Sequence, residues 1–242
     1  RFARFTVLAR EKTLSIATGL FTRRYYVLKR DRLHFTDIRR NLFTIVTGSA
    51  SVFVSVSGYG SRKGESPVII PAEDNSQLAT LIRTLFPSVC SSKISVRAHS
   101  STLLLYLTQP LILMGICIAV YYIPPLFLPL AGEIISFAAA LGAGFAVFFG
   151  LFRLFCWRRS GFGCTENCLS LCCYRGLYLH TVIVPFDEIS SVIYRHPLFL
   201  RKRGLCSITV VVDTKRRQRF TLAGVPFEAA GEILTRAQSV AR

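Results

Sequence analysis

Apolar positions alternate with polar ones along the chain up to Pro71, and the period then changes. Alternating or branched apolar runs are typical of half-buried β-strands. Turn signals separate these runs, among them Thr18-Gly19, residues 47–49 and residues 58–65. The pattern predicts five strands, over residues 13–17, 25–28, 38–45, 51–57 and 66–71.

A helix is predicted directly after these strands. Over residues 73–87 the apolar positions recur every three or four residues, which is typical of an amphipathic helix, and Pro87 ends it. The second half of the chain repeats the order, with strands predicted over residues 168–172, 179–184, 191–194, 207–212 and 219–222 and a closing helix over residues 226–240. Several strands followed by one helix suggest a small barrel or sandwich plugged by that helix.

The two halves also match residue by residue. Residues 28–57 align with residues 184–213 without a gap. The offset is 156 positions, which is the separation of Asp31 from Asp187. Identical pairs include Arg39 with Arg195, Gly48 with Gly204, Ser51 with Ser207, Val54 with Val210 and Val56 with Val212. An internal repeat of this kind predicts two copies of one domain, over residues 11–88 and 160–242. Residues 1–10 are expected to lead into the first copy from an upstream membrane span.

A long stretch without charged residues separates the copies. No Asp, Glu, Lys or Arg occurs over residues 98–132, and after Glu133 none occurs before Arg153. About 20 apolar residues cross ~30 Å of hydrocarbon, and three prolines within residues 124–129 favour a turn. The pattern predicts a transmembrane helical hairpin over residues 102–154, with spans at about 102–123 and 130–153. A pair of buried core helices is the alternative.

The charges next to the spans predict their orientation. Basic residues flank both outer ends of the hairpin, whereas the connecting turn carries only Glu133. By the positive-inside rule, both domain copies then lie in the cytoplasm. Eight cysteines without a regular framework spacing also fit a reducing compartment. The flanking basic residues are Lys93, Arg97, Arg153, Arg158 and Arg159.

One ordered motif in the second copy resembles a known family. The order (I/V)P-x-x-x-I-x-x-V followed by P-L-x-x-R-x-G-L-x-S-I-x-V is similar to the bacterial pleckstrin-homology-like (PH-like) domain of YdbS/YdbT-type membrane proteins. The first copy matches less fully, through GLFTRR, DRLHFTDIRRNLF and GSASVFVSVSG, and has Lys29 where the second has Pro185. The matching positions are Val184, Pro185, Ile189, Val192, Pro197, Leu198, Arg201, Gly204, Leu205, Ser207, Ile208 and Val210.

The resemblance implies the fold class and the cellular location. It implies an α+β membrane protein of two PH-like β-barrel domains, each of seven strands with a C-terminal helix, joined by the transmembrane hairpin. It implies a multi-pass protein of the bacterial inner (plasma) membrane with both globular domains cytoplasmic. It does not imply a known reaction.

No enzyme signature stands out in the sequence. Walker loops, HExxH, GxSxG and paired-glycine dinucleotide motifs do not occur. The four histidines, His34, His99, His180 and His196, have no carboxylate at helical spacing and are assigned to surface or strand positions. We therefore expect no enzymatic activity and no cofactor.

A cysteine cluster offers the sharpest alternative chemistry. Cys164, Cys168, Cys172 and Cys173 are four thiols in ten residues, enough to hold zinc tetrahedrally. Their spacing differs from the CxxC pairs of zinc knuckles, and Cys168 and Cys172 occupy alternating strand positions where cysteine acts as a small apolar residue. We therefore expect no metal site.

The positive charge is the strongest functional signal. The formal net charge is +17, and a membrane anchor would place basic clusters beside anionic lipid, where each Lys or Arg contributes ~1 kcal/mol. Solvated turn residues that only reinforce topology are the alternative, and no nucleic-acid partner is expected. The residues assigned to lipid or partner binding are Arg23, Arg24, Lys29, Arg30, Arg32, Arg201, Lys202 and Arg203.

The second span carries a small residue at every fourth position. Close backbone approach over small residues favours helix packing in lipid. We expect this strip to receive the first span, through a face such as Leu107, Leu111, Met114 and Ile118, or an identical strip from another subunit. The strip consists of Ala138, Gly142, Ala146 and Gly150.

The sequence thus favours a non-enzymatic, membrane-anchored scaffold. Its PH-like domains are expected to bind a protein partner, or another copy of the chain, with anionic headgroups assisting. The alternative is a component of a membrane transport or membrane-stress and antimicrobial-resistance system whose spans take part directly. An ionisable residue at mid-membrane would favour transport, and the only Asp, Glu, Lys or Arg over residues 98–152 is Glu133, which lies near a span end.

Overall fold

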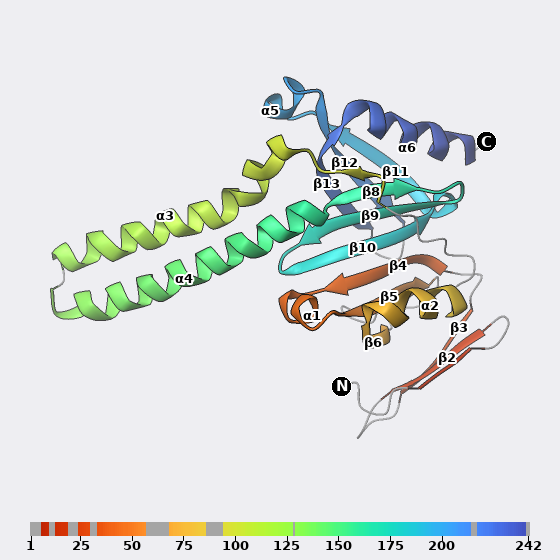
Figure 1. Ribbon diagram of the computed structural model, residues 1–242, viewed down its shortest axis with the longest axis horizontal. Helices are drawn as coiled ribbons and strands as arrows, with labels where there is room; N and C mark the ends of the chain where they lie inside the picture. Colours follow the sequence, from red (N-terminus) through yellow and green to blue (C-terminus); the bar gives the residue numbers. More distant parts are fainter. Residues whose placement is uncertain are drawn as a thin grey trace. The chain divides into compact units, whose positions relative to one another are not determined.

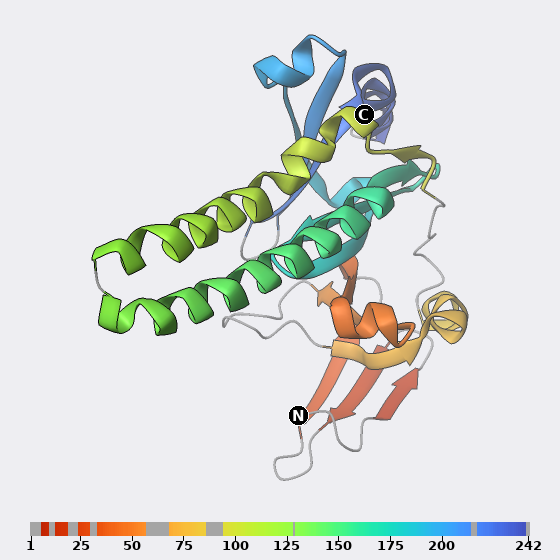
Figure 2. The same ribbon diagram turned by 60° about the vertical axis from the view of Figure 1, so that its left-hand side comes forward.

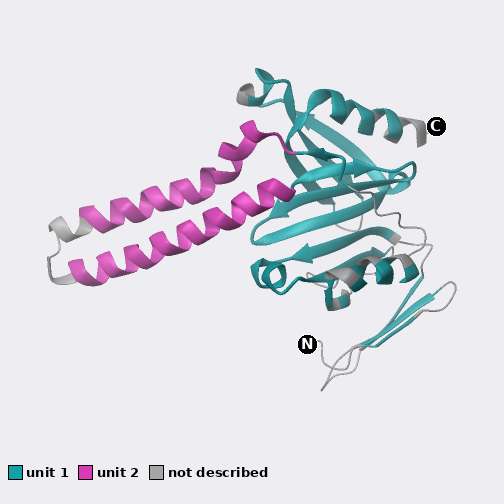
Figure 3. Cartoon of the chain, viewed as in Figure 1, with its two compact units in different colours: residues 1–97, 160–242 teal, residues 98–159 magenta. Residues whose placement is uncertain are grey.

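The computed structural model describes residues 6–9, 13–18, 24–29, 33–56, 68–85, 94–127, 129–213 and 217–240. The chain forms two compact units (Figure 3). Unit 1 contains residues 1–97 and 160–242, which include both repeat copies, and unit 2 contains residues 98–159.

The first copy consists of two groups of three strands and a helix. Strands β1 (Thr6–Ala9), β2 (Thr13–Thr18) and β3 (Arg24–Lys29) form one antiparallel sheet in that order. Strands β4 (Leu33–Arg40), β5 (Ser49–Val56) and β6 (Val68–Asp74) follow, with a short helix α1 (Leu42–Val46) between β4 and β5. The amphipathic helix α2 (Asn75–Leu85) buries Leu78 and Ile82, as its apolar spacing predicts.

The second copy has the same order and one more strand. Strands β7 (Val96–Arg97), β8 (Gly161–Cys164), β9 (Cys168–Arg175) and β10 (Tyr178–Pro185) are neighbours in that order. Strands β11 (Ile189–Arg195), β12 (Leu205–Val212) and β13 (Gln218–Pro226) form a three-stranded sheet, and helix α6 (Phe227–Val240) closes the copy. The short helices η3 (Phe186–Glu188) and α5 (Leu198–Arg201) join these strands (Figure 1).

The backbone confirms the internal repeat at the predicted offset. Leu33 pairs with Val56 and Phe35 with Ser55, and in the second copy Ile189 pairs with Val212 and Ser191 with Val211. Each copy therefore has the same β-bulge at the same place. Gly48 and Gly204, which align in the sequence, have φ values of 71° and 64°, so both supply the left-handed backbone of the turn before β5 or β12.

One predicted strand is partly a helix. The prediction over residues 38–45 is wrong beyond Arg40, because α1 begins at Leu42. The Asn41 side chain accepts a hydrogen bond from the Thr44 backbone N–H, and the Thr44 hydroxyl accepts one from the Asn41 N–H. This capping box starts a helical turn that the apolar pattern alone did not reveal.

A single sheet joins the two copies. Strand β4 of the first copy pairs antiparallel with β10 of the second. Thr36 lies opposite Ile183 at one end of this pairing, and Arg40 lies opposite Leu179 at the other. The result is a seven-stranded sheet in the order β6-β5-β4-β10-β9-β8-β7 (Figure 1). The expectation of two closed β-barrels is therefore wrong. Neither copy closes its own sheets into a barrel, because β4 of the first copy pairs with β10 of the second.

The pairing of β4 with β10 also exchanges core residues between the copies. Directly paired residues share a face of the sheet, and successive residues alternate between faces. Ile183 and Cys168 of the second copy therefore lie in the core that β1–β6 and α2 build. Phe35 of the first copy lies in the core of the second copy, with its ring edge-to-face on Phe220 at 5.4 Å.

Unit 2 is an antiparallel pair of helices, as Figure 2 shows. Helix α3 (Leu103–Phe127) follows a 3₁₀ turn, η2 (Ser100–Thr102), and α4 (Pro129–Arg159) returns. Both are long and apolar enough to cross a membrane, over Ser100–Ile123 and Gly132–Arg159. Helix α3 ends beyond the predicted limit at residue 123, so the prolines at 124 and 125 lie within its last turn.

The exchanged core residues should stabilise both copies. We expect Ile183→Ala to lower the free energy of unfolding by about 2–4 kcal/mol, because it leaves a cavity in a core that belongs to the other copy. The matched control is Leu8→Ala, since Leu8 is 66% exposed whereas Ile183 is 0% exposed. The control should change stability by less than about 0.5 kcal/mol. Equal losses in denaturant melts of the full chain would contradict the shared core.

Candidate functional site

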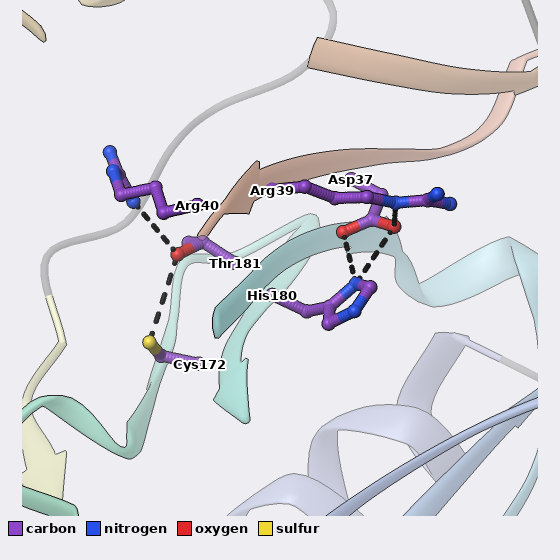
Figure 4. A network of polar contacts seen from close by, with 6 residues as sticks. All are labelled: Asp37, Arg39, Arg40, Cys172, His180 and Thr181. Atoms are coloured by element: carbon purple, nitrogen blue, oxygen red, sulfur yellow. Dashed lines mark hydrogen bonds and ion pairs between the residues drawn. The ribbon is translucent and has the colours of Figure 1, made fainter. Parts of the chain in front are cut away.

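The strands β4 and β10 enclose a buried polar network between the copies. His180 Nδ1 lies 3.0 Å from each carboxylate oxygen of Asp37, and Arg39 Nε donates to Asp37 Oδ2 at 2.7 Å (Figure 4). Asp37 and His180 are both buried. A buried carboxylate is stable only when hydrogen-bonded or paired, so these contacts offset the desolvation of Asp37. We call Asp37, Arg39 and His180 the seam network.

Further polar contacts connect the copies. On the opposite face of the sheet, Arg40 Nη1 donates to Thr181 Oγ1 at 3.3 Å, and Thr181 Oγ1 donates to Cys172 Sγ at 3.7 Å (Figure 4). His34 of the first copy pairs with Glu188 of the second. The two copies are therefore held in one register by polar contacts as well as by backbone pairing.

The assignment of His34 and His180 to ordinary strand positions was incomplete. Each has a carboxylate partner in the other copy, at sequence separations of 154 and 143 residues. No local spacing could indicate these pairs. His99 accepts a hydrogen bond from the Ser101 backbone N–H at 3.2 Å and caps η2, and the His196 ring lies 5.0 Å from that of Phe227.

The predicted basic residues lie on separate elements of unit 1. Arg201 ends α5, and Lys202 and Arg203 occupy the following turn; all three are exposed. Lys29 is exposed on β3, and Arg24 begins that strand. The other three predicted residues, Arg23, Arg30 and Arg32, lie outside the described residues.

A pocket adjoins the basic turn of the second copy. It has a volume of about 520 Å³ and is lined by His196, Arg201, Gly204 and Phe227. The backbone N–H of Phe227 donates to the Gly204 carbonyl at 3.0 Å, which ties the start of α6 to the end of the basic turn. Arg201 is the one predicted basic residue that lines this pocket, and the His196 side chain lines it as well.

The comparison with protein families agrees with this architecture. A family profile for the bacterial PH domain matches residues 1–85 and 110–241. The chain belongs to the bacterial PH domain family. A search of the curated proteins finds no match. Bacterial PH domains are, like PH domains in general, typically binding modules rather than catalysts, so the two matched regions indicate a binding or scaffold function.

The cysteines of this bacterial PH protein point in different directions. Cys168 lies in the core of the first copy and Cys173 in that of the second, because an odd spacing on a strand places them on opposite faces. Among the described residues, no three His, Cys, Asp or Glu side chains converge on a point that could hold a metal ion. Burial raises the pKa of the Cys164 thiol to about 11 and also raises the pKa of Cys173. Both thiols are therefore protonated and poorly nucleophilic near neutral pH.

The small-residue strip of α4 meets α3 over three of its four members. A Cβ added at Gly142 would lie 2.9 Å from Cys117 Sγ, and one at Gly150 would lie 3.7 Å from Pro110 Cβ. Ala146 is buried, whereas Ala138 is exposed. A strict four-residue repeat drifts by about 40° per step around an α-helix. Ala139, which is buried, therefore continues the contact face in place of Ala138.

The predicted face of α3 was wrong for Leu111 and Ile118. These side chains are 57% and 51% exposed, whereas Tyr106 and Pro110 are buried and Cys117 lies opposite Gly142. The same helix pair also buries a residue that the sequence analysis assigned only to the basic flank of the hairpin. Arg153 is buried, donates from Nη2 to Gln109 Oε1, and places its guanidinium carbon 5.4 Å from the centre of the Phe149 ring.

Packing at Gly142 gives a direct test of the helix pair. We expect Gly142→Ile to lower the thermal unfolding temperature of the full chain in detergent, with a cost of about 1–3 kcal/mol, because the new side chain collides with Cys117. The matched control is Gly144→Ile, since a Cβ at Gly144 meets nothing within 4 Å. Both changes alter helix propensity alike. If the two variants melt alike, the strip has no role in packing.

Proposed function

We propose that this bacterial PH protein is a non-enzymatic, membrane-anchored scaffold at the inner face of the bacterial plasma membrane. The observation that carries the proposal is the combination, in one chain, of two repeat copies that match the bacterial PH family and two apolar helices that lie between these copies in the sequence. Both PH copies would lie in the cytoplasm, where they bind a protein partner with help from anionic lipid headgroups.

The surface of unit 2 supports a membrane anchor. Helices α3 and α4 expose many large apolar side chains, which is unfavourable in water and normal in lipid. A core helix of a soluble protein would be mostly buried, whereas only 11% of each candidate span is buried. Exposed residues of this kind include Leu104, Leu111, Ile112, Ile116, Tyr122, Ile134, Phe137, Leu141, Phe145 and Leu151.

The basic turn at residues 201–203 supports an interaction with anionic headgroups. Its three cations are exposed, and none of them is needed to pair a buried acid among the described contacts. The adjoining pocket adds His196, whose imidazole donates a further hydrogen bond to a phosphate oxygen when an N–H faces it. A protein partner with an acidic surface would use the same cations.

The alternative of direct transport receives less support from the helix pair. Ionisable groups near the middle of a span mark ion or proton pathways. Glu133 lies in the first turns of α4, and Arg153 lies in its last turns. Arg153 contacts Gln109 and Phe149 of the same helix pair, an arrangement that favours packing of the hairpin.

The topology of the anchor can be tested with reporter fusions. A reporter that is active only in the cytoplasm should work after Arg242 and fail when inserted near Pro129. This follows from the basic residues at the outer ends of the hairpin and the acidic Glu133 at its turn. Activity near Pro129 with silence after Arg242 would overturn the proposed orientation.

Lipid binding by the basic turn can be tested on the full chain in detergent. Titrated short-chain phosphatidylglycerol should raise the unfolding temperature more than phosphatidylcholine does, because a ligand that binds only the folded state stabilises it. Changing Arg201, Lys202 and Arg203 to Ser should remove most of that difference, and more visibly at low salt.

A control variant removes the same charge elsewhere. Arg175, Arg217 and Arg219 are exposed and lie outside the basic turn, so their replacement by Ser should preserve the response to phosphatidylglycerol. Equal losses in both variants would show a general charge effect and contradict a role for the turn. An unchanged response after the first substitution would assign the turn to topology or to a protein contact.

A further inference from the structure

Among the open strand edges of the described sheets, those of β3 and β11 stand out. β3 pairs only with β2, and β11 pairs only with β12. An unpaired edge presents a row of backbone N–H and C=O groups that can accept another strand. The repeat makes these two edges special, because β3 is the counterpart of β10 and β11 is the counterpart of β4. Their counterparts are the two strands that pair with each other across the copies.

Side chains on β3 are exposed where their repeat counterparts on β10 are covered by the other copy. Ile183 on β10 is 0% exposed, because the pairing with β4 carries it into the core of the other copy. Its counterpart at the 156-residue offset is Val27 on β3, which is 66% exposed. Tyr25, the counterpart of Thr181, is 70% exposed. The face of β3 that corresponds to the Thr181 and Ile183 face of β10 therefore carries two exposed apolar side chains, with the exposed Lys29 at its end.

On β11, the face that corresponds to Phe35 and Asp37 of β4 is also uncovered. Asp37 on β4 is 1% exposed within the seam network, and its counterpart Ile193 on β11 is 38% exposed. Phe35, which lies in the core of the second copy, corresponds to Ser191, which is exposed. The opposite face of β11 packs normally, with Val192 and Tyr194 against the core of its own copy.

We propose that β11 of one chain pairs antiparallel with β3 of a second copy of the same chain, in the geometry that β4 and β10 already show. Transferring the register of β4 and β10 by the repeat offset places Val192 opposite Val27 and Tyr194 opposite Tyr25. Val27 then enters the core beside Val192, as Ile183 enters the other core beside Thr36. Each partner strand is thus one whose repeat counterpart already makes this pairing within the chain, since β10 corresponds to β3 and β4 corresponds to β11.

The contact would be head-to-tail. Within a chain the second sheet of the first copy joins the first sheet of the second copy, and the reciprocal pair, β11 with β3, is not formed. A head-to-tail contact leaves one complementary edge free at each end of a pair, so further chains can add until a ring closes or an open row forms. The partner surface is thus β3 on one side and β11 on the other.

One feature of the transferred register opposes the pairing. Arg195 would lie opposite Arg24, where the internal pair has Arg39 opposite His180 with Asp37 between them. Like charges directly opposite each other on neighbouring strands repel, and salt screens this repulsion. The association should therefore be weaker than the internal pairing and should be measured at physiological salt.

The test uses the full chain in a mild detergent, with light scattering or mass photometry over a range of concentrations. The parent chain should form species larger than one chain as its concentration rises. Val27→Asp and Ile193→Lys should each raise the concentration needed for association by more than about tenfold, because an unpaired charge would be buried at the contact. Lysine is used at position 193 because an aspartate there would lie between Arg195 and Arg24, as Asp37 lies between Arg39 and His180. Leu8→Asp is the matched control, since Leu8 is also 66% exposed on the same sheet but lies on β1, and it should associate as the parent does.

Mixing the two variants tests the direction of the contact. A Val27→Asp chain keeps an intact β11 and an Ile193→Lys chain keeps an intact β3, so an equimolar mixture should form pairs that neither variant forms alone. A parent chain that stays single at every concentration overturns the proposal. So do association of either variant alone, failure of the mixture to pair, or loss of association in Leu8→Asp.

Folding of the variants is checked by their unfolding temperatures. If Val27→Asp melts below the parent, Val27→Thr, which keeps the β-branched shape, takes its place. The proposal goes beyond membrane anchoring and lipid binding, and the topology and phosphatidylglycerol experiments involve neither edge strand. Their failure and the failure of the strand contact are therefore distinguishable.

Discussion

The antiparallel pairing of β4 with β10 is the constraint on which the rest of unit 1 depends. It converts two repeat copies into one seven-stranded sheet and carries apolar side chains from each copy into the core of the other. Because strand residues alternate between faces, a shift of one residue in this pairing would turn Ile183 and Phe35 away from the cores they now fill and put their neighbours in those places. The register is therefore held by the cores on both faces at once.

Polar chemistry in the bacterial PH protein is organised by the same pairing. Asp37 is buried only because β10 covers it, and the same strand supplies His180 to satisfy it, while Arg39 of β4 completes the contact. The cysteines divide between the two faces of β9 and act as small apolar residues, with burial raising the pKa of Cys173. The buried chemistry is thus structural, whereas the cations of the basic turn, Arg201, Lys202 and Arg203, are exposed.

The residue pattern alone was sufficient to predict most of the strands, the longer helices and the internal repeat. Alternation identified most strands of both copies, three- and four-residue spacing identified α2 and α6, and the 156-residue offset identified the repeat. These features are local, or depend on comparing one stretch of the chain with another. The structure added the bulge and the left-handed glycine turn that both copies share. The helix α1 escaped prediction because its start depends on one capping side chain, Asn41, rather than on periodicity.

The sequence by itself determined the family, the order of elements and the two apolar helices, because composition and periodicity encode burial along one element at a time. Only the tertiary structure decided which strands are neighbours, and therefore that the sheets stay open and that His34 and His180 find carboxylates in the other copy. It also decided that Ala139, and not Ala138, is buried on α4. Partners more than 140 residues apart meet only when the register of two strands is set, and that register depends on both cores together.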